Sequence, residues 1–198
     1  MYWSSSSVAD DSYDAWRVGF HFGYIYTNEK DYEHIYARCV RGGRFECGAE
    51  TCTDPVSGLV WQKTPATIDT WSNAITHCEG LDLAGHATGW RLPTISELRT
   101  LIRGCPATVP GGSCGVTDGC LTAGCRDASC YECISSEGPA DGCYWPGAGL
   151  EGPCSYYWSS SAVEDVGGEA WDVDFLFGGI GKDSVDAGPL TRCIRDRI

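Results

Sequence analysis

The stretch YWSSSAVEDVGGEAWDVDFLFG, residues 157–178, decides the fold of this chain, because a near copy, YWSSSSVADDSYDAWRVGFHFG, stands at residues 2–23. Farther along, Arg38 and Cys39 match a second Arg–Cys pair at an offset of 154 residues. Self-similarity of this kind is typical of tandem copies of one structural unit. The matched pairs at an offset of 155 residues are Tyr2/Tyr157, Trp3/Trp158, Val8/Val163, Trp16/Trp171, Phe20/Phe175 and Phe22/Phe177.

Both copies alternate apolar and polar residues, which is typical of β-strands with one buried face. The alternation runs through residues 16–22 in the first copy and through residues 171–177 in the second. In the second copy we expect the apolar members to face a core and the aspartates to face solvent. The apolar members are Trp171, Val173, Phe175 and Phe177, and the aspartates are Asp172 and Asp174.

The segment between the copies contains signals for two helices. Helical spacing of apolar residues predicts an amphipathic helix over residues 67–82, capped by Thr67 or Asp69. A second helix is predicted to begin at Thr94, which has the spacing of a capping box with Glu97. These helices and the strands together predict an α+β fold.

A cysteine-rich insert follows the second helix, over residues 104–155. It contains few apolar residues with which to build a core, so we expect disulfides to order it, each worth about 2–4 kcal/mol. Its pairing pattern cannot be deduced from spacing alone. The eight cysteines are Cys105, Cys114, Cys120, Cys125, Cys130, Cys133, Cys143 and Cys154.

Composition narrows the class of protein. Thirteen cysteines in 198 residues are typical of a secreted, disulfide-bonded chain. The formal charge of −13 argues against nucleic acid as a partner, and no apolar run is long enough for a membrane span. Because Met1 is followed by no signal-peptide pattern, we expect the chain to be part of a larger extracellular protein.

Several motifs resemble one known family when they are taken in order. The resemblance is to the Lcl C-terminal-domain family; it covers residues 52–195, and residues 2–42 match the second half of the family pattern. The motifs are TDPVSGLVWQ at 53–62, TWSNAITHCEGL at 70–81, GWRLPTISELRTLI at 89–102, YWSSS at 157–161, AWDVDF at 170–175 and RCIR at 192–195.

The resemblance implies a variant C-type-lectin-like fold, related to formylglycine-generating-enzyme-type domains. Two helices would flank a small twisted antiparallel sheet, and a disulfide from Cys78 to Cys193 would join the first helix to the last strand. Arg91 would pair with a carboxylate. We therefore expect a complete lectin-like domain over residues 44–198, preceded over residues 1–43 by the C-terminal half of another repeat.

Three cysteines remain outside these assignments: Cys39, Cys47 and Cys52. Cys39 corresponds to Cys193 in the second copy, so its family partner would lie before residue 1. Three fates stay open for Cys39: a bond to Cys47 or Cys52, a free thiol, or a bond to another chain.

No catalytic or cofactor-binding residues are predicted. The serine runs of both copies lack the G-x-S-x-G pattern and a histidine placed alike in both, so a structural role is favoured. Cys130 and Cys133 have C-x-x-C spacing, but no second pair stands at the distance of a zinc ribbon. Structural disulfides are therefore the preferred interpretation for this pair.

Acidic residues follow the YWSSS motif in both copies, and grouped carboxylates can bind Ca²⁺. A solvated acidic loop is the competing interpretation. Exposed tyrosines at 24, 26, 32, 36 and 156 are candidates for stacking on sugar rings or for packing between repeats. The calcium candidates are Asp10, Asp11, Asp14, Glu164, Asp165 and Glu169.

We therefore expect a non-enzymatic binding or adhesion module, extracellular or on a bacterial cell surface, with a glycan or protein ligand. The family namesake resembles an adhesin for host glycosaminoglycan, but the acidity of this chain argues against a sulfated ligand. The alternative is a structural protein. In that case another copy, or an upstream repeat, would complete the half-domain and build a fibre or array.

Overall fold

The computed structural model describes residues 2–8, 11–19, 24–30, 45–134, 138–140, 142–146 and 149–197. The chain divides into two compact units, Met1–Gly42 and Gly43–Ile198. Each unit is described by itself. Among the described residues no helix has the length and apolar character needed to cross a membrane.

The first unit is a three-stranded antiparallel sheet of β1 (Tyr2–Val8), β2 (Asp11–Gly19) and β3 (Tyr24–Glu29), in that order. β2 contains residues 16–19, the first part of the alternating run predicted over residues 16–22. The remainder of that run and Cys39 lie outside the described residues.

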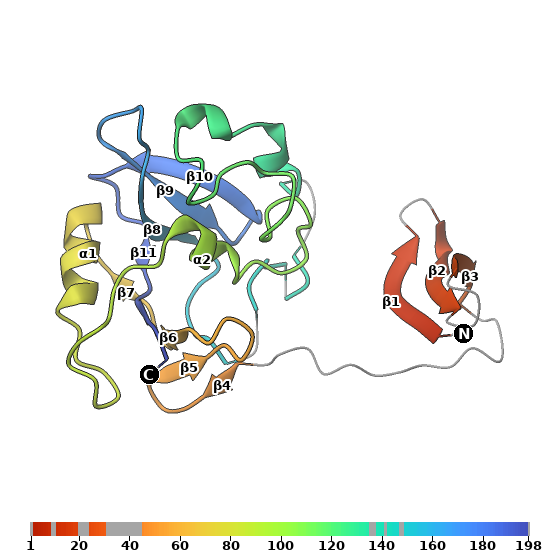
Figure 1. The fold of residues 1–198 in the computed structure, drawn as a ribbon, viewed down its shortest axis with the longest axis horizontal. Coiled ribbons are helices and arrows are strands. Elements are labelled where there is room, and N and C mark those ends of the chain that lie inside the picture. Colours follow the sequence, from red (N-terminus) through yellow and green to blue (C-terminus); the bar gives the residue numbers. More distant parts are fainter. Residues whose placement is uncertain are drawn as a thin grey trace. The chain divides into compact units, whose positions relative to one another are not determined.

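The second unit contains a five-stranded sheet in the order β10-β9-β8-β11-β7 (Figure 1). β11 runs parallel to β8, and the other neighbouring strands are antiparallel. The sheet is therefore mixed, whereas an antiparallel sheet was expected. The strands are β7 (Ala66–Thr67), β8 (Tyr156–Ala162), β9 (Glu169–Asp174), β10 (Gly179–Ser184) and β11 (Leu190–Thr191).

A smaller sheet in the order β12-β6-β5-β4 lies at the end of this unit where the C-terminus is drawn in Figure 1. It is antiparallel throughout, and its last strand brings the chain end back beside β6. Its strands are β4 (Glu46–Cys47), β5 (Thr51–Thr53), β6 (Val60–Gln62) and β12 (Ile194–Arg195).

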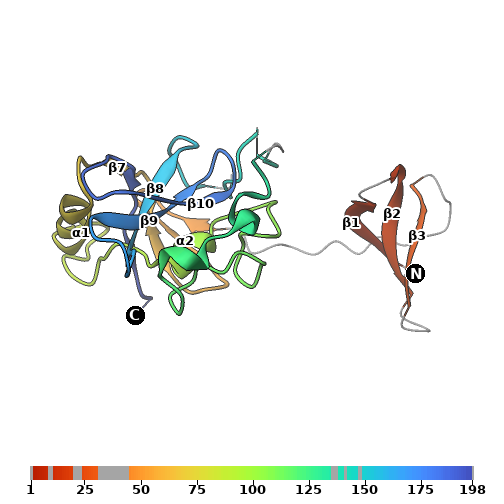
Figure 2. The same cartoon turned by 90° about the horizontal axis from the view of Figure 1, so that it is seen from above.

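Two helices pack against opposite faces of the five-stranded sheet. α2 (Ile95–Arg99) shares a core with Trp171 and Ile180, whereas α1 (Trp71–Glu79) shares a core with Trp158 and Ala170. Trp158 pairs directly with Asp172, the strand neighbour of Trp171, so the two cores lie on opposite sides of the pleat. Figure 2 shows strands β8, β9 and β10 of this sheet, with α1 and α2, from above.

The N-termini of the two helices differ in how well they follow the sequence signals. Thr94 and Glu97 form the predicted capping box of α2. α1 is shorter than predicted and is capped by Thr70, whose hydroxyl accepts the N–H of Asn73, so neither Thr67 nor Asp69 is its cap. Thr67 lies in β7 instead, paired with β11.

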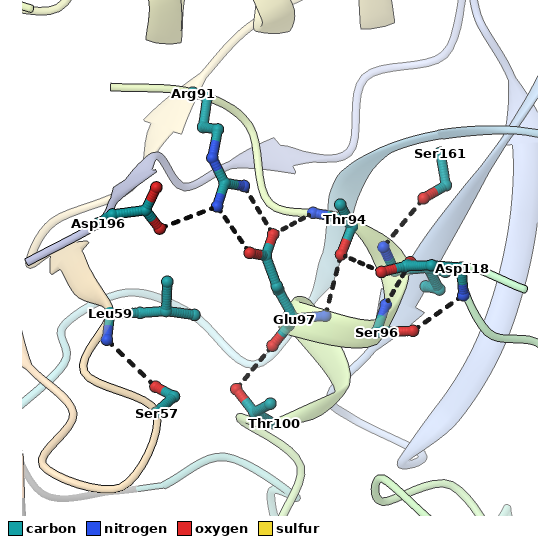
Figure 3. Close-up of polar contacts among 11 residues, drawn as sticks. Ser57, Leu59, Arg91, Thr94, Ser96, Glu97, Thr100, Asp118, Ser161 and Asp196 are labelled. Atoms are coloured by element: carbon teal, nitrogen blue, oxygen red, sulfur yellow. Dashed lines mark hydrogen bonds and ion pairs between the residues drawn. The ribbon is translucent and has the colours of Figure 1, made fainter. Parts of the chain in front are cut away.

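Polar contacts fix the start of α2 against its surroundings (Figure 3). Arg91 pairs with both oxygens of Glu97 at 2.7 Å and with Asp196 at 3.3 Å. The Glu97 carboxylate also accepts the backbone N–H of Thr94, and the Ile95 N–H donates to Ser161 in β8. Arg91 therefore has the carboxylate partner that the family resemblance implies.

The cysteine-rich insert contains two 3₁₀ turns, η1 (Ala123–Cys125) and η2 (Ala128–Tyr131). Arg99 of α2 is buried and donates to the carbonyls of Thr108, Val109 and Val116, which ties the helix to the insert. Contrary to expectation, the insert also supplies core residues. These are Ala107, Val116, Tyr144, Trp145 and Leu150, together with several of its cysteines.

The described residues contain six disulfides, all within the second unit. One joins α1 to the segment between β11 and β12 through Cys78 and Cys193, which is the bond implied by the family resemblance. Cys47 bonds to Cys52, so neither is available to Cys39. The eight insert cysteines pair among themselves as Cys105–Cys133, Cys114–Cys130, Cys120–Cys125 and Cys143–Cys154.

Candidate functional site

A cavity of about 270 Å³ opens where the insert meets β9 and β10. We call it the Asp172 pocket, after the carboxylate that it contains. The strands supply acidic residues and glycines, and the insert supplies an arginine and apolar side chains. Its lining consists of Arg126, Tyr131, Ile134, Tyr156, Asp172, Asp174, Phe177, Gly179, Gly181, Lys182 and Asp183.

Asp172 does not face solvent as the strand alternation predicted, since it is only 1% exposed. It does lie on the face opposite Trp171, but other groups cover that face. Gly181 is its cross-strand neighbour, and a Cβ at position 181 would lie 2.6 Å from Oδ1 of Asp172. The absence of a side chain at Gly181 therefore makes room for the carboxylate.

Neither oxygen of the Asp172 carboxylate has a hydrogen-bond partner among the described residues. Burial raises the pKa of Asp172 well above its ordinary value, and the nearby charges of Asp183 and Asp174 raise this pKa further. Arg126 acts in the opposite direction. A buried carboxyl group without a partner is costly, and groups of this kind concentrate at functional sites.

Three other charged groups of the pocket, Asp174, Arg126 and Lys182, already have protein partners. Asp174 accepts the backbone N–H groups of Leu176 and Phe177 and so fixes the turn after β9. Arg126 donates through Nε to the carbonyl of Ile180 at 3.0 Å, with its guanidinium 4.0 Å from the centre of the Tyr131 ring. Lys182 is ion-paired with Glu169.

Aromatic side chains form the rim of the pocket. Tyr156 is exposed, and the negative charge of Asp174 beside it raises the pKa of its hydroxyl. Phe177 is 37% exposed and lines the pocket, so the prediction that it faces the core is wrong. The strand ends at Asp174, and the turn that follows breaks the alternation before residue 177.

Comparison with family models places this chain among known domains. The model described as the Lcl C-terminal domain matches residues 50–195. The chain belongs to this family. The resemblance inferred from the motifs is thus confirmed, and the whole Asp172 pocket lies inside the matched range of this Lcl C-terminal domain. Searches among curated proteins and among solved structures found no match.

The calcium candidates within the Lcl C-terminal domain have other contacts. Asp165 accepts the N–H of Ala123 at 2.6 Å at the start of η1, Glu169 pairs with Lys182, and Glu164 is exposed. In the first unit, Asp14 lies in β2, whereas Asp10 and the Asp11 side chain lie outside the described residues. No group of three potential metal ligands is brought together among the residues that the structure describes.

The serines and the C-x-x-C pair of the Lcl C-terminal domain have structural contacts. Ser159 donates to the carbonyl of Trp171 at 2.6 Å, and Ser161 accepts the N–H of Ile95. Cys130 and Cys133 bond to different partners, Cys114 and Cys105.

A second cavity of about 380 Å³ lies near the two helices and is lined by Ile75, Glu79, Arg91, Leu92, Thr94 and Ser160. Its arginine is already paired with Glu97. The Asp172 pocket differs because it contains a buried carboxylate whose oxygens have no partner. We therefore take the Asp172 pocket as the candidate functional site.

Sequence reasoning missed most of this pocket, although one local signal was available. β10 places glycine opposite each aspartate of β9, with Gly181 facing Asp172 and Gly179 facing Asp174. Glycine within a strand often marks a close approach by another group. Arg126 and Tyr131 carry no comparable signal, because only the path of the insert brings them to β10.

Proposed function

We propose that this chain is a non-enzymatic, extracellular or cell-surface module that binds a glycan in the Asp172 pocket. The observation that carries the proposal is the make-up of the pocket: a buried carboxylate, further acidic groups and a rim of tyrosine and phenylalanine. Sugar hydroxyls donate hydrogen bonds to carboxylates, and the apolar faces of sugar rings pack on aromatic side chains. The volume of about 270 Å³ suits a single sugar ring.

Two further features support this assignment. Six disulfides are typical of proteins that fold in an oxidising compartment. Helices on opposite faces of a small sheet, with a disulfide from the first helix to the end of the chain, also agree with a C-type-lectin-like fold. That finer fold assignment is part of the proposal.

A glycan array probed with the full chain tests the proposal. We expect saturable binding to neutral or cationic glycans, and we expect Tyr156→Ala to weaken it about five- to tenfold because a rim contact is lost. The matched control is Tyr13→Ala, which removes an exposed tyrosine of the first unit. Absence of binding to every glycan, or equal binding by both variants, would contradict a glycan site here.

A second candidate function, assembly through the first unit, is favoured by the strand register. Tyr2 pairs with Val18 and Ala15 with Asn28, and at an offset of 155 residues Tyr157 pairs with Val173 and Ala170 with Asp183. Both sheets also have a register shift at the same place in the first strand, after Trp3 and after Trp158. The first unit therefore reproduces the pairing of β8, β9 and β10.

The first unit differs in what covers its apolar residues. Trp171 and Ile180 are completely buried in the second unit, in a core that α2 and the insert share. Their counterparts Trp16 and Ile25 are 39% and 68% exposed. An apolar sheet face of this kind is suited to completion by another copy.

Light scattering of the full chain over a range of concentrations tests this second function. Assembly predicts a mass that rises with concentration, and Ile25→Ser should reduce the rise. Val56→Ser, which changes an exposed valine of the second unit, is the control and should not. A monomer at every concentration would rule out assembly through this face.

A further inference from the structure

Asp172 destabilises the folded chain without a visible structural benefit. Its side chain is 1% exposed and neither oxygen has a partner among the described residues, so the energy lost on desolvation is not recovered by hydrogen bonds. Its strand neighbours are ordinary core residues, since Trp171 and Val173 are completely buried. Core packing therefore does not explain the acidic group at position 172, and we look for its role in binding.

The sheet geometry does not require an acid at this position. In the first unit, which has the same register, Arg17 and Tyr26 are the cross-strand pair that corresponds to Asp172 and Gly181. Arg17 lies over the ring of Tyr26 at 5.3 Å, so this pair is made of two side chains that contact each other. In the second unit Gly181 makes room for the Asp172 carboxylate, and both residues line the cavity.

The charged groups around Asp172 favour a cationic ligand. Asp174 and Asp183 come from the two strands, while Arg126 comes from the insert and Lys182 from β10. Lys182 is ion-paired with Glu169, which lies outside the lining, and Arg126 alone is shared among the three aspartates, with its Nε already donating to the Ile180 carbonyl. The pocket therefore has acidic groups beyond those its own cations pair with, in a chain whose net charge of −13 also attracts cations.

The aromatic rings that line the pocket also favour a cationic ligand. Tyr156 and Phe177 line the pocket, and the faces of aromatic rings attract ammonium groups. The cavity is of the size of one sugar ring and too small for an extended chain. A sugar ring that carries an ammonium group has both the positive charge and the size that the pocket favours.

We propose that the Asp172 pocket binds an amino sugar whose primary ammonium group contacts the Asp172 carboxylate. This inference rests on the proposed function, because it specifies the ligand class of the same site. The ammonium group would give Asp172 the hydrogen-bond donors that it lacks, and Asp183 would accept from a ring hydroxyl. A sulfated sugar would meet the acidic groups of the pocket and be excluded.

The test measures binding of the full chain by calorimetry at pH 6 to two matched probes, a pentamer of glucosamine and a pentamer of N-acetylglucosamine. These probes differ only in the charge and shape of the nitrogen substituent. We expect at least tenfold tighter binding of the free amine. Asp172→Asn should remove most of that preference, whereas Asp186→Asn, an equal charge change at an exposed position outside the pocket, should leave it intact.

The outcomes separate this inference from the proposed function. Equal binding of both pentamers, with no effect of Asp172→Asn, would overturn the ammonium assignment but leave a glycan site. Tighter binding of the Nα-acetyl-lysine methylamide than of the glucosamine pentamer would also overturn it, because the ligand would then be a basic peptide. No binding of any glycan on the array would remove the proposed function itself. Circular dichroism of both aspartate variants establishes that they are folded.

Discussion

At the scale of single residues, Asp172 couples the stability of the fold to pH. Burial raises its pKa in the folded chain well above the ordinary value of 3.8, so the folded chain holds this proton more tightly than the unfolded chain does. The resulting stability is fully present below the unfolded pKa. It is lost as pH rises from that value through the raised pKa of the folded state.

Asp172→Asn should therefore stabilise the chain, and more so at higher pH. Asparagine keeps the shape of the side chain but cannot ionise, so the cost of a buried charge disappears. We expect the variant and the natural chain to have similar melting temperatures near pH 4 and to diverge as pH increases toward 7. Melting curves across this range measure the divergence, and Asp186→Asn should show none. A constant difference at all pH values would mean that Asp172 does not titrate as proposed.

The burial of Asp172 also shows where residue-level prediction stops. Strand alternation correctly places Asp172 and Trp171 on opposite faces of β9. It does not reveal that the second face is covered, because the cover comes from Arg126 and Tyr131, more than forty residues earlier in the sequence. Burial on a strand face is set by distant segments, and a local pattern carries no information about them.

At the scale of elements, α2 was predictable because its stabilising contacts are local. The capping box joins Thr94 to Glu97 within one turn, and the structure contains both of its hydrogen bonds. The cap of α1 could not be predicted, because Thr67, Asp69 and Thr70 are all residue types that often cap helices. Pairing of β7 with β11 at Thr67 removes the earliest of the three candidates, and that contact spans more than one hundred residues.

Glu97 should contribute strongly to the stability of α2. Burial alone would raise the pKa of Glu97, but hydrogen bonds from Arg91 and from the Thr94 backbone outweigh it and lower this pKa below 4.5. Glu97→Gln weakens the ion pair and the capping box, so we expect a loss of about 2 kcal/mol in the free energy of unfolding at pH 7. Urea titration measures this loss.

The pH dependence of the Glu97 effect has the opposite sign to that of Asp172. A lowered pKa gives stability that is present above the unfolded pKa and is lost as pH falls through the folded value. The gap between Glu97→Gln and the natural chain should therefore shrink below about pH 4. Glu79→Gln at the exposed end of α1 is the control. A gap that persists at low pH would assign the effect to packing and not to charge.

The disulfides differ in how much of the chain they constrain. Cys78–Cys193 spans 115 residues, whereas Cys47–Cys52 spans five. By loop-closure entropy, removal of the long-range bond should cost about 5 kcal/mol and removal of the short one about 2 kcal/mol. Alanine pairs at each bond, compared by thermal unfolding, test this ranking. Equal losses would show that native packing outweighs chain entropy.

At the scale of the whole molecule, the sequence repeat was informative about strand pairing, but the order of strands in the five-stranded sheet could not be predicted. The repeat in the sequence corresponds to a repeat in strand register, and the family match begins at residue 50, after the first copy. The mixed order of the five-stranded sheet could not be predicted in the same way. It depends on β11 joining β8 in parallel, and β11 is a strand of two residues with no pattern of its own.

The second unit should fold without the first. Both core clusters are built from residues after position 44, and the six described disulfides also lie there. We therefore expect residues 43–198, produced alone under oxidising conditions, to melt within about 2 °C of the corresponding transition of the full chain, a shift equivalent to less than about 1 kcal/mol. Peptide mapping should find the same six bonds in both. A markedly lower melting temperature would mean that the first unit stabilises the Lcl C-terminal domain directly, and the assembly function would then need a face other than the one that contains Trp16 and Ile25.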